Sequence, residues 1–381
     1  MELFAKTFQG LEETLAAEIT QLGGQDVKIL KRGVSFNANK ELLYKANLCC
    51  RTAIRILQPV LKFEARNEEE LYWGIYKFKW KNFFTTKQTF AIDADAYSDF
   101  FRHSKYVALK SKDAIVDAFR DEFNSRPSVD TEKPDLLINI RVTGATVIVS
   151  IDSSGESLHK RGYRGATQHK APLNEILAAG LVMLSGWDKT VPLIDPMCGS
   201  ATILIEAAMI GLNIPPNMLR KEFGFMRWNN YDPALWLQVL NQAKSKITDN
   251  RLRIYGSDVA GVAVDIAKES VMIMRLTHAI TIEKKPFEEL ETEWKNGMII
   301  TNPPYGDRLE KKNIDDFYSM IGDILKKRFA GYEAWIFSGN FDALKQIGLR
   351  ASQKIVLHNG PIECKFQKYE LFTGSKLRDN K

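Results

Sequence analysis

The stretch VPLIDPMCGSATILIEAAMIGL, residues 191–212, contains in succession a short apolar run, a compact loop and an apolar helical pattern. The run ends at Asp195, and the loop contains Gly199, whose backbone can adopt conformations that are closed to most other residues. A buried strand that leads through a tight loop into a helix is the repeating unit of open α/β sheets. The stretch therefore predicts an α/β domain in the C-terminal half of the chain.

Further apolar runs follow it. Residues 253–274 predict a strand that ends at Asp258 and a second helix, residues 297–306 predict a strand that ends at Asn302, and residues 332–340 predict a fourth strand. Strands that alternate with helices form a mostly parallel sheet, covered by helices on both faces. Ligands of such sheets bind beyond the carboxyl ends of the strands, so these polar residues are predicted to share one edge.

The two strand-end aspartates suggest the kind of ligand. Asp195 could accept a hydrogen bond from a cationic amino group, and Asp258 suits the hydroxyls of a ribose. Alternatively, both residues only cap the helices that follow them. The loop has neither the G-x-G-x-x-G spacing nor the lysine of a P-loop, so a nucleoside without phosphates fits better than a dinucleotide or a nucleoside triphosphate.

The motif NPPY, residues 302–305, predicts an amine-binding site. Pro303 and Pro304 fix the backbone and leave its carbonyl groups free as acceptors. With the amide oxygen of Asn302 they could accept both hydrogens of an exocyclic amine, while Tyr305 stacks on the base. A proline turn with a buried tyrosine is the alternative.

The composition limits the protein class. The chain has 381 residues, which predicts two or three domains. Its four cysteines and five histidines lack metal-ligand and disulfide spacings, so we expect neither a metal nor a disulfide framework. No apolar run is long enough to span a membrane and the N-terminus lacks a secretory pattern, so we expect a cytoplasmic protein without a membrane partner.

The first 155 residues predict an α+β region with a binding role, because they contain no recognisable catalytic cluster. Two basic patches, in residues 72–84 and 159–170, combine positive charges with aromatic rings and are candidates for RNA phosphate and base contacts. Their basic residues are Lys77, Lys79, Lys81, Lys160, Arg161 and Arg164. In the first patch the alternative is favoured, in which most rings belong to a core and the lysines form its solvated rim.

Three motifs, DPMCGSATILIEAA, GSDVAGVAVDIAKES and TNPPYGDRL, resemble those of class I S-adenosylmethionine-dependent amino-methyltransferases. The wider sequence resembles the THUMP-containing ribosomal RNA guanine-N2-methyltransferase family, of the 23S rRNA type, over essentially the whole chain. The segments that carry this second resemblance are FQGLEETLAAEITQLGG, VALKSKDAIVD, HKRGYRGA and APLNEILAAGLVMLSGW. Members of that family often bear the name N6-adenine-specific DNA methylase, because NPPY is shared.

The resemblance implies a ferredoxin-like region over residues 1–55, a THUMP domain over 56–155 and a Rossmann-like methyltransferase domain over 156–381. Residues 56–85 could belong to either of the first two. The implied cofactor is S-adenosylmethionine and the implied partner is 23S ribosomal RNA, free or in a pre-ribosomal particle. Rival functions are a DNA adenine-N6 methyltransferase, a protein glutamine methyltransferase and a non-catalytic RNA-binding assembly factor.

The resemblance also assigns residues, and here the chain departs from the family twice. The implied cofactor-binding residues are Asp195, Pro196, Met197, Cys198, Gly199, Asp258, Val259 and Asn302; the implied catalytic residues are Asn302, Pro303, Pro304 and Tyr305. Pro286 precedes Phe287 where relatives often carry an acidic residue that contacts adenine, and Ala201 stands where a glycine is usual. The long insertion over residues 211–250 is expected to form a packed cap over the cofactor helix rather than an RNA contact.

Overall fold

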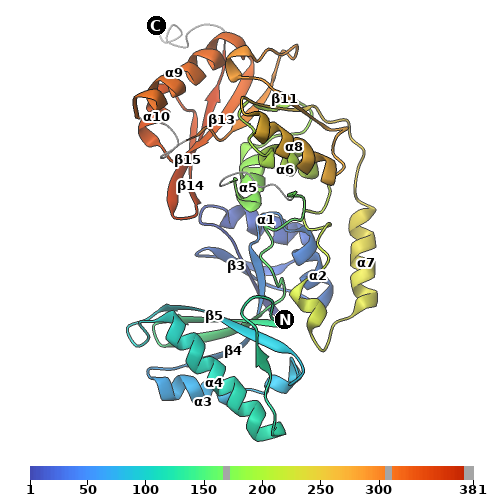
Figure 1. The fold of residues 1–381 in the computed structure, drawn as a ribbon, viewed down its shortest axis with the longest axis vertical. Helices are drawn as coiled ribbons and strands as arrows, with labels where there is room; N and C mark the ends of the chain where they lie inside the picture. Colours follow the sequence, from blue (N-terminus) through green and yellow to red (C-terminus); the bar gives the residue numbers. More distant parts are fainter. Residues whose placement is uncertain (166–171, 305–310, 373–381) are drawn as a thin grey trace. The chain divides into compact units, whose positions relative to one another are not determined.

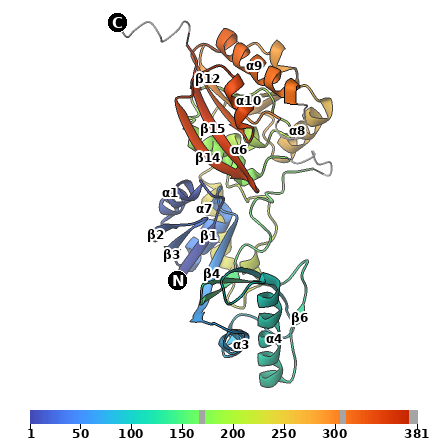
Figure 2. The ribbon, with the colours of Figure 1, turned by 90° about the vertical axis from the view of Figure 1, so that its left-hand side faces the viewer.

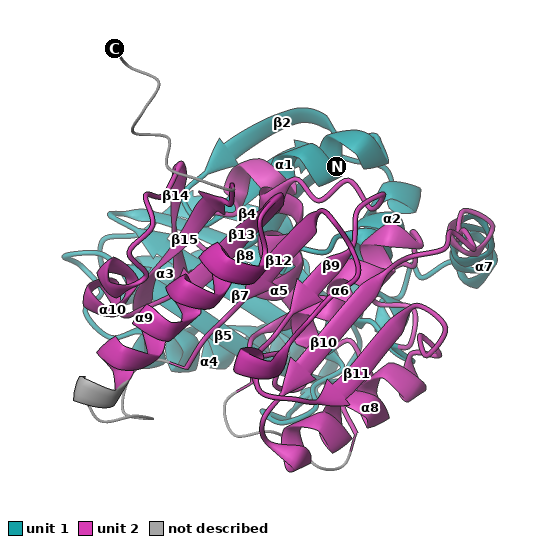
Figure 3. Cartoon of the chain, turned by 90° about the horizontal axis from the view of Figure 1, so that it is seen from above, with its two compact units in different colours: residues 1–7, 16–160, 220–242 teal, residues 8–15, 161–219, 243–381 magenta. Residues whose placement is uncertain are grey.

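The computed structural model describes residues 1–165, 172–304 and 311–372 (Figure 1). The chain divides into two compact units, each made of several segments (Figure 3). Unit 1 comprises residues 1–7, 16–160 and 220–242, and unit 2 comprises residues 8–15, 161–219 and 243–381. Helix α1 (Glu12–Leu22) runs from one unit into the other.

Unit 1 is built on one eight-stranded sheet with the order β2-β3-β1-β4-β8-β7-β5-β6. The strands are β1 (Glu2–Lys6), β2 (Gln25–Leu30), β3 (Gly33–Asn37), β4 (Arg55–Glu64), β5 (Thr89–Tyr97), β6 (Ser128–Val129), β7 (Leu136–Thr143) and β8 (Thr146–Asp152). Strand β4 pairs with β1 near its start and with β8 from Leu57 to Glu64, so the two N-terminal regions expected from the sequence share a sheet. The β4–β8 register shifts between Pro59 and Leu61, as expected where proline supplies no N–H to the ladder.

Three helices of unit 1 are α2 (Lys40–Cys49), α3 (Glu68–Tyr76) and α4 (Ser104–Phe123). Apolar residues of α3 and α4 form a core cluster with the strands β5, β7 and β8. Figure 2 shows α3 and α4 in the same part of unit 1. Trp80 and Phe84 belong to this core, and the Trp80 indole donates to the carbonyl of Ile75 at 2.8 Å. The favoured interpretation of residues 72–84 is therefore confirmed for these rings, because their side chains are fully packed.

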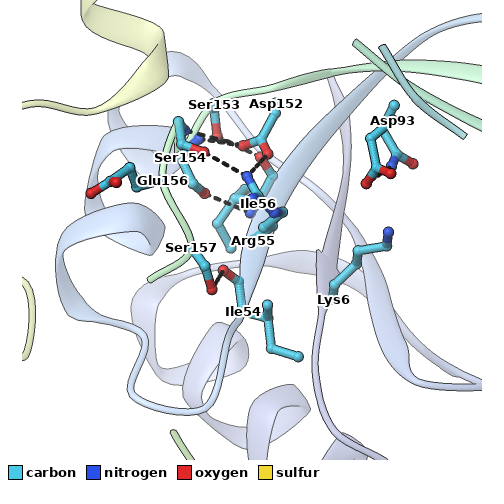
Figure 4. A network of polar contacts seen from close by, with 12 residues as sticks. Lys6, Ile54, Arg55, Ile56, Asp93, Asp152, Ser153, Ser154, Glu156 and Ser157 are labelled. Carbon is cyan, nitrogen blue, oxygen red and sulfur yellow. Dashed lines mark hydrogen bonds and ion pairs between the residues drawn. The ribbon is translucent and has the colours of Figure 1, made fainter. Parts of the chain in front are cut away.

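A buried polar network holds the ends of β4 and β8 together (Figure 4). The Asp152 carboxylate pairs with Arg55 and accepts a hydrogen bond from the backbone N–H of Ser154 at 2.7 Å. Burial raises the pKa of Asp152, and the Arg55 guanidinium opposes that rise. The Ser154 hydroxyl donates to Asn47 on α2 at 2.7 Å, so helix and sheet share one network.

The structure corrects the expectation for the long insertion. Residues 220–242 pack in unit 1, not as a cap over the cofactor helix. Phe225 stacks on Tyr44 with ring centroids 4.3 Å apart, and the Tyr44 hydroxyl accepts a hydrogen bond from the backbone N–H of Asp232 at 3.0 Å. Helix α7 (Pro233–Lys244) begins directly after this contact. Burial of these aromatic rings stabilises the segment against α2.

Unit 2 contains a seven-stranded sheet with the order β11-β10-β9-β12-β13-β15-β14. The strands are β9 (Leu193–Asp195), β10 (Ile254–Asp258), β11 (Ile280–Lys284), β12 (Gly297–Thr301), β13 (Tyr332–Ser338), β14 (Gln353–Asn359) and β15 (Ile362–Glu370). The run from β11 to β13 is parallel, whereas β15 is antiparallel to both its neighbours. The chain builds outward in opposite directions from β9, so a topological switch point lies between β9 and β12. Strands β11, β14 and β15 are not among the four strands that the sequence predicted for this part of the chain.

The helices described in unit 2 are α5 (Glu175–Ser185), α6 (Thr202–Gly211), α8 (Gly261–Ile273), α9 (Lys311–Arg328) and α10 (Phe341–Gln346). Apolar residues of α9 and α10 form a core cluster with strands β12 and β13. In the part of the chain that the structure describes, no helix combines the length and hydropathy that crossing a membrane requires.

The close contact between α9 and α10 gives a test of this packing. A Cβ atom at Gly322 of α9 would lie 1.9 Å from the Ile347 backbone oxygen, so Gly322→Ala should destabilise the protein by about 1–3 kcal/mol through forced displacement of backbone. Thermal unfolding of the purified chain measures the effect. The control is Gly261→Ala in α8, where a Cβ would meet only Lys284 side-chain atoms at 3.7 Å or more. Equal melting temperatures for Gly322→Ala and wild type would contradict the packing described.

Candidate functional site

A cavity of about 440 Å³ lies in unit 2 at the carboxyl ends of β9, β10 and β12. It brings together the three strand-end residues Asp195, Asp258 and Asn302, as the parallel-sheet argument requires. The other lining residues are Pro172, Leu173, Pro196, Met197, Cys198, Gly199, Ser200, Thr202, Ile203, Val259, Pro286, Phe287, Glu288, Pro304 and Phe317. The cavity is therefore surrounded by residues from several separate segments of the chain.

Asp195 is almost fully buried at the end of β9. Its Oδ1 accepts hydrogen bonds from the Thr301 hydroxyl at 2.8 Å and from the Met197 backbone N–H at 3.2 Å. Burial raises the pKa of Asp195 to about 7; the hydrogen bonds oppose the rise, and the negative charge of Asp258 adds to it. A cationic group in the cavity would favour the ionised form of this carboxyl.

The loop after Asp195 approaches the cavity through its backbone. Gly199 has φ of +52°, and its N–H donates to Asp258 Oδ2 at 2.9 Å. Among the described residues, apart from its two chain neighbours, no atom lies within 4 Å of a Cβ placed at Gly199, so the space beside this backbone is available to a ligand. Ala201 also adopts positive φ, +59°, at the start of α6, a conformation that costs a residue with a Cβ about 1–2 kcal/mol.

The carboxylate of Asp258 accepts hydrogen bonds within the protein and can also accept hydrogen bonds from a ligand. Its Oδ1 accepts a hydrogen bond from the Ala260 backbone N–H at 2.9 Å; because Ala260 is itself the N-cap of α8 (Gly261–Ile273), this bond forms a turn before the helix and does not cap a helical N–H. Each carboxylate oxygen can accept more than one hydrogen bond, so the group keeps acceptor capacity towards the cavity. The neighbouring Val259 exposes 68% of its surface while lining the cavity, which leaves an apolar contact open to a ligand.

Asn302 presents an unusual polar atom. Its Oδ1 is buried and has no hydrogen-bond partner among the described residues. A buried unpaired acceptor costs about 1–3 kcal/mol, so such an atom at a cavity is a candidate to receive a ligand donor. Pro304 also lines the cavity, whereas Pro303 is buried and does not. Tyr305, the remaining residue of the motif, lies outside the described residues.

The candidate RNA-binding lysines of unit 1 are exposed. Lys77 and Lys79 line a groove of about 630 Å³ together with Phe78 and Phe83, whose rings stack with centroids 5.5 Å apart. Lys81 forms an ion pair with Glu122. Lys160, from the second patch, pairs with Glu156 at 2.9 Å and stays largely exposed.

The two arginines of the second patch require a correction. The side chain of Arg161 is fully buried and pairs with Glu206 on α6 at 3.3 Å, so its charge does not face an RNA phosphate. Arg164 is mostly buried and pairs with Glu175 on α5 at 2.6 Å. A glutamate inside an apolar helix, such as Glu206 in α6, indicates a buried cationic partner. This partner was not predicted from the sequence.

Several residues around the cavity were not predicted from the sequence. Pro172, Leu173 and Phe317 line it without belonging to a recognised motif, and Thr301 holds Asp195 from the residue before Asn302. Pro286 and Phe287 do line the cavity, and Glu288 brings an acidic side chain one position after Phe287. Although Pro286 stands where relatives often carry an acidic residue, the carboxylate of Glu288 therefore lies at this wall of the cavity.

Comparisons with known proteins identify the family of the chain and its domains. Residues 161–368 match the family "RMKL-like, methyltransferase domain", residues 65–152 match the THUMP domain and residues 2–57 match the RlmL ferredoxin-like domain. The chain belongs to the RMKL-like methyltransferase family. This RMKL-like chain thus has a ferredoxin-like and THUMP region followed by an α/β methyltransferase domain, and the fold expected from the sequence is confirmed.

Relatives cover almost the whole RMKL-like chain. The "Putative RNA methyltransferase slr0064" of Synechocystis is 40% identical over 97% of this chain and 96% of its own. The methyltransferase structure SMU.472, complexed with S-adenosylhomocysteine (SAH), has a TM-score of 0.88 and 32% identity over 98% of this chain and 99% of its own. A Listeria monocytogenes structure, named a predicted N6-adenine-specific DNA methylase, has a TM-score of 0.88 and 28% identity over 97% and 96%.

The raised pKa of Asp195 predicts a pH dependence of stability. Because the folded state holds this proton up to about pH 7, whereas the ordinary pKa of an aspartate is 3.8, stability should fall as pH rises between these values. Asp195→Asn should remove that loss, so the variant should match wild type near pH 4 and exceed it by roughly 2–4 kcal/mol at pH 8. Thermal unfolding of the ligand-free proteins across this pH range checks the difference.

The control for this measurement is Asp265→Asn, which changes an exposed aspartate of α8. That variant should follow the wild-type pH profile. A parallel profile for Asp195→Asn and wild type would show that Asp195 does not hold a proton near neutral pH.

Proposed function

We propose that this chain transfers a methyl group from S-adenosylmethionine to the exocyclic N2 amine of a guanine in 23S ribosomal RNA. The observation that carries the proposal is the buried Oδ1 of Asn302, which has no hydrogen-bond partner among the described residues and lies at a cavity beside the β9 loop. Support for RNA as the substrate class comes from the THUMP match and from the name of the Synechocystis relative. The finer assignments, guanine N2 and 23S rRNA, rest on the sequence resemblance.

S-adenosylmethionine is the cofactor, and the residues at the cavity fit it. When bound, it supplies an electrophilic methyl group on a sulfonium. The open space beside Gly199 suits the cationic methionine part of the cofactor, which would favour the ionised form of Asp195 and which Pro196, Met197 and Cys198 would enclose. Asp258 would accept hydrogen bonds from the ribose, with Val259 against the nucleoside and Glu288 available to the adenine amine.

The amine of the target base would be held by the NPPY motif. An aryl amine is a weak nucleophile, since its lone pair is delocalised into the ring. Asn302 Oδ1, together with a proline carbonyl of the motif, would accept the two amine hydrogens and turn the lone pair towards the methyl donor. Orientation supplies most of the rate gain, and no strong base is required before transfer; solvent takes the proton that the methylated amine releases.

The RNA would be bound by unit 1 and extruded at the target base. The groove at Lys77 and Lys79 offers two cationic side chains beside a pair of stacked rings, which suits a phosphate backbone and an unpaired base. Lys160 remains a candidate contact, and Lys81 a weaker one because it already pairs with Glu122. The same proposal includes the domain boundaries at residue 55, between the ferredoxin-like region and the THUMP domain, and at residue 155, between the THUMP domain and the methyltransferase domain.

A DNA adenine-N6 methyltransferase is the second candidate. The name of the Listeria relative favours it, and an adenine amine would meet the same acceptors. Nucleoside analysis separates the two, because one reaction yields N2-methylguanine in RNA and the other yields N6-methyladenine in duplex DNA. DNA methylation without RNA methylation would reverse the order of the candidates.

Removal of the amine acceptor should abolish transfer. Asn302→Ala should lower the rate of methylation of unmodified 23S rRNA about 100- to 1,000-fold, because the amine loses its orientation, while SAH affinity changes little. Labelled cofactor measures transfer and calorimetry measures SAH binding. The control is Asn296→Ala, an exposed residue just before β12. Wild-type activity in Asn302→Ala would remove the assigned role.

Loss of the groove lysines should weaken RNA binding through lost phosphate contacts. The double variant Lys77→Ala, Lys79→Ala should lower 23S rRNA affinity and reduce the slope of log affinity against log salt by about 1–2. Filter binding over a salt series gives both quantities. Lys345→Ala, at an exposed ion pair in unit 2, should leave both unchanged. An unchanged slope in the double variant would place the RNA elsewhere.

A further inference from the structure

Arg164 makes a forked contact at one wall of the cavity. Its Nε donates to Glu175 Oε1 at 2.6 Å, and its Nη2 donates to the Leu173 backbone oxygen at 2.9 Å. The two acceptors lie on either side of Asn174, the N-cap of α5, whose side chain accepts from the Ile176 N–H at 2.9 Å. One planar guanidinium therefore fixes the start of α5 relative to the residue before it.

The residues fixed in this way are part of the cavity. Pro172 and Leu173 line it together with Cys198, Gly199 and the first turn of α6. Glu175 is buried and Arg164 is mostly buried, so water competes weakly for this contact. A displacement of Leu173 would therefore change the part of the cavity wall that Pro172 and Leu173 form.

The segment that carries Arg164 is itself anchored. Arg161 and the Tyr163 hydroxyl both donate to Glu206 Oε1, at 3.3 and 3.1 Å, in the middle of α6. A Cβ at Gly165 would lie 2.2 Å from the Glu269 carboxyl group on α8. The segment thus contacts α5, α6 and α8, and Arg164 projects from a fixed backbone.

We propose that Arg164 is a positioning residue for the cofactor, which acts by holding the Pro172–Leu173 wall through the Leu173 carbonyl. The proposal rests on the cofactor assignment made above, and it replaces an RNA-phosphate role for this arginine. Arginine suits the task because its rigid fork reaches a carboxylate and a carbonyl together. A lysine keeps the charge opposite Glu175 but cannot reproduce the fork.

Two variants separate positioning from general stability. Arg164→Lys keeps the ion pair with Glu175 and loses the forked geometry at Leu173. Glu175→Gln keeps the side-chain shape and leaves the Arg164 bond to the Leu173 carbonyl in place. If Arg164 positions the wall, Arg164→Lys should weaken SAH binding about tenfold, because the hydrogen bond to the Leu173 carbonyl is lost. When the two variants lose the same amount of melting temperature, Arg164→Lys should weaken SAH binding more than Glu175→Gln does.

Measurements on the full chain are SAH affinity by calorimetry, melting temperature, and 23S rRNA affinity over a salt series. Arg164→Lys should also raise the KM for the cofactor about tenfold with kcat within twofold, and leave the RNA salt slope unchanged. Arg350→Lys, at an exposed arginine of the same unit, is the matched control.

Each other outcome has a defined meaning. Unchanged SAH affinity in Arg164→Lys overturns the proposal, and so does a fall in RNA affinity and salt slope without a change in SAH binding. If SAH affinity falls in both variants only in proportion to the loss of melting temperature, the ion pair is purely structural and the proposal is overturned as well. Absence of SAH binding by the wild-type chain would instead refute the proposed function.

Discussion

The hydrogen bond from Thr301 to the buried carboxyl of Asp195 joins the ends of β12 and β9 at the point where the sheet order reverses. The two strands are parallel neighbours in the register Met298 to Leu193 and Ile299 to Ile194. This register places the β9 loop and the residues after Thr301 at the same edge of the sheet. That alignment brings Asp195 and Asn302 together, although they come from segments about 100 residues apart in the sequence.

The fold keeps several polar groups at this edge in states that are costly without a ligand. Asp195 is buried with a raised pKa, the Asn302 amide oxygen lacks a partner among the described residues, and Ala201 has a left-handed backbone. In the network around Asp152, by contrast, the buried carboxylate is paired with Arg55 and hydrogen-bonded to the Ser154 N–H. A buried acceptor without a described partner and a carboxyl with a raised pKa, both at one cavity, are typical of a functional site, where a ligand supplies the missing partner.

Family domains and physical units do not coincide in this chain. The ferredoxin-like and THUMP matches end and begin near residues 57 and 65, yet β4 carries one continuous sheet through both. Residues 220–242 lie within the methyltransferase match but pack in unit 1, because Phe225 and its aromatic neighbours are buried against Tyr44. A shared sheet and a returning segment both make unit 1 dependent on chain from outside the THUMP match.

The sequence by itself determined the α/β class and the edge that holds Asp195, Asp258 and Asn302, because strand-end residues of a parallel sheet meet at one edge whatever the rest of the fold does. It also indicated that the rings of residues 72–84 are mostly core. Only the tertiary structure decided where Arg161 and Arg164 lie, since their partners Glu206 and Glu175 are on separate helices and burial depends on packing. Local sequence shows that a side chain is charged, but whether water or a carboxylate surrounds that charge is set by contacts between distant segments.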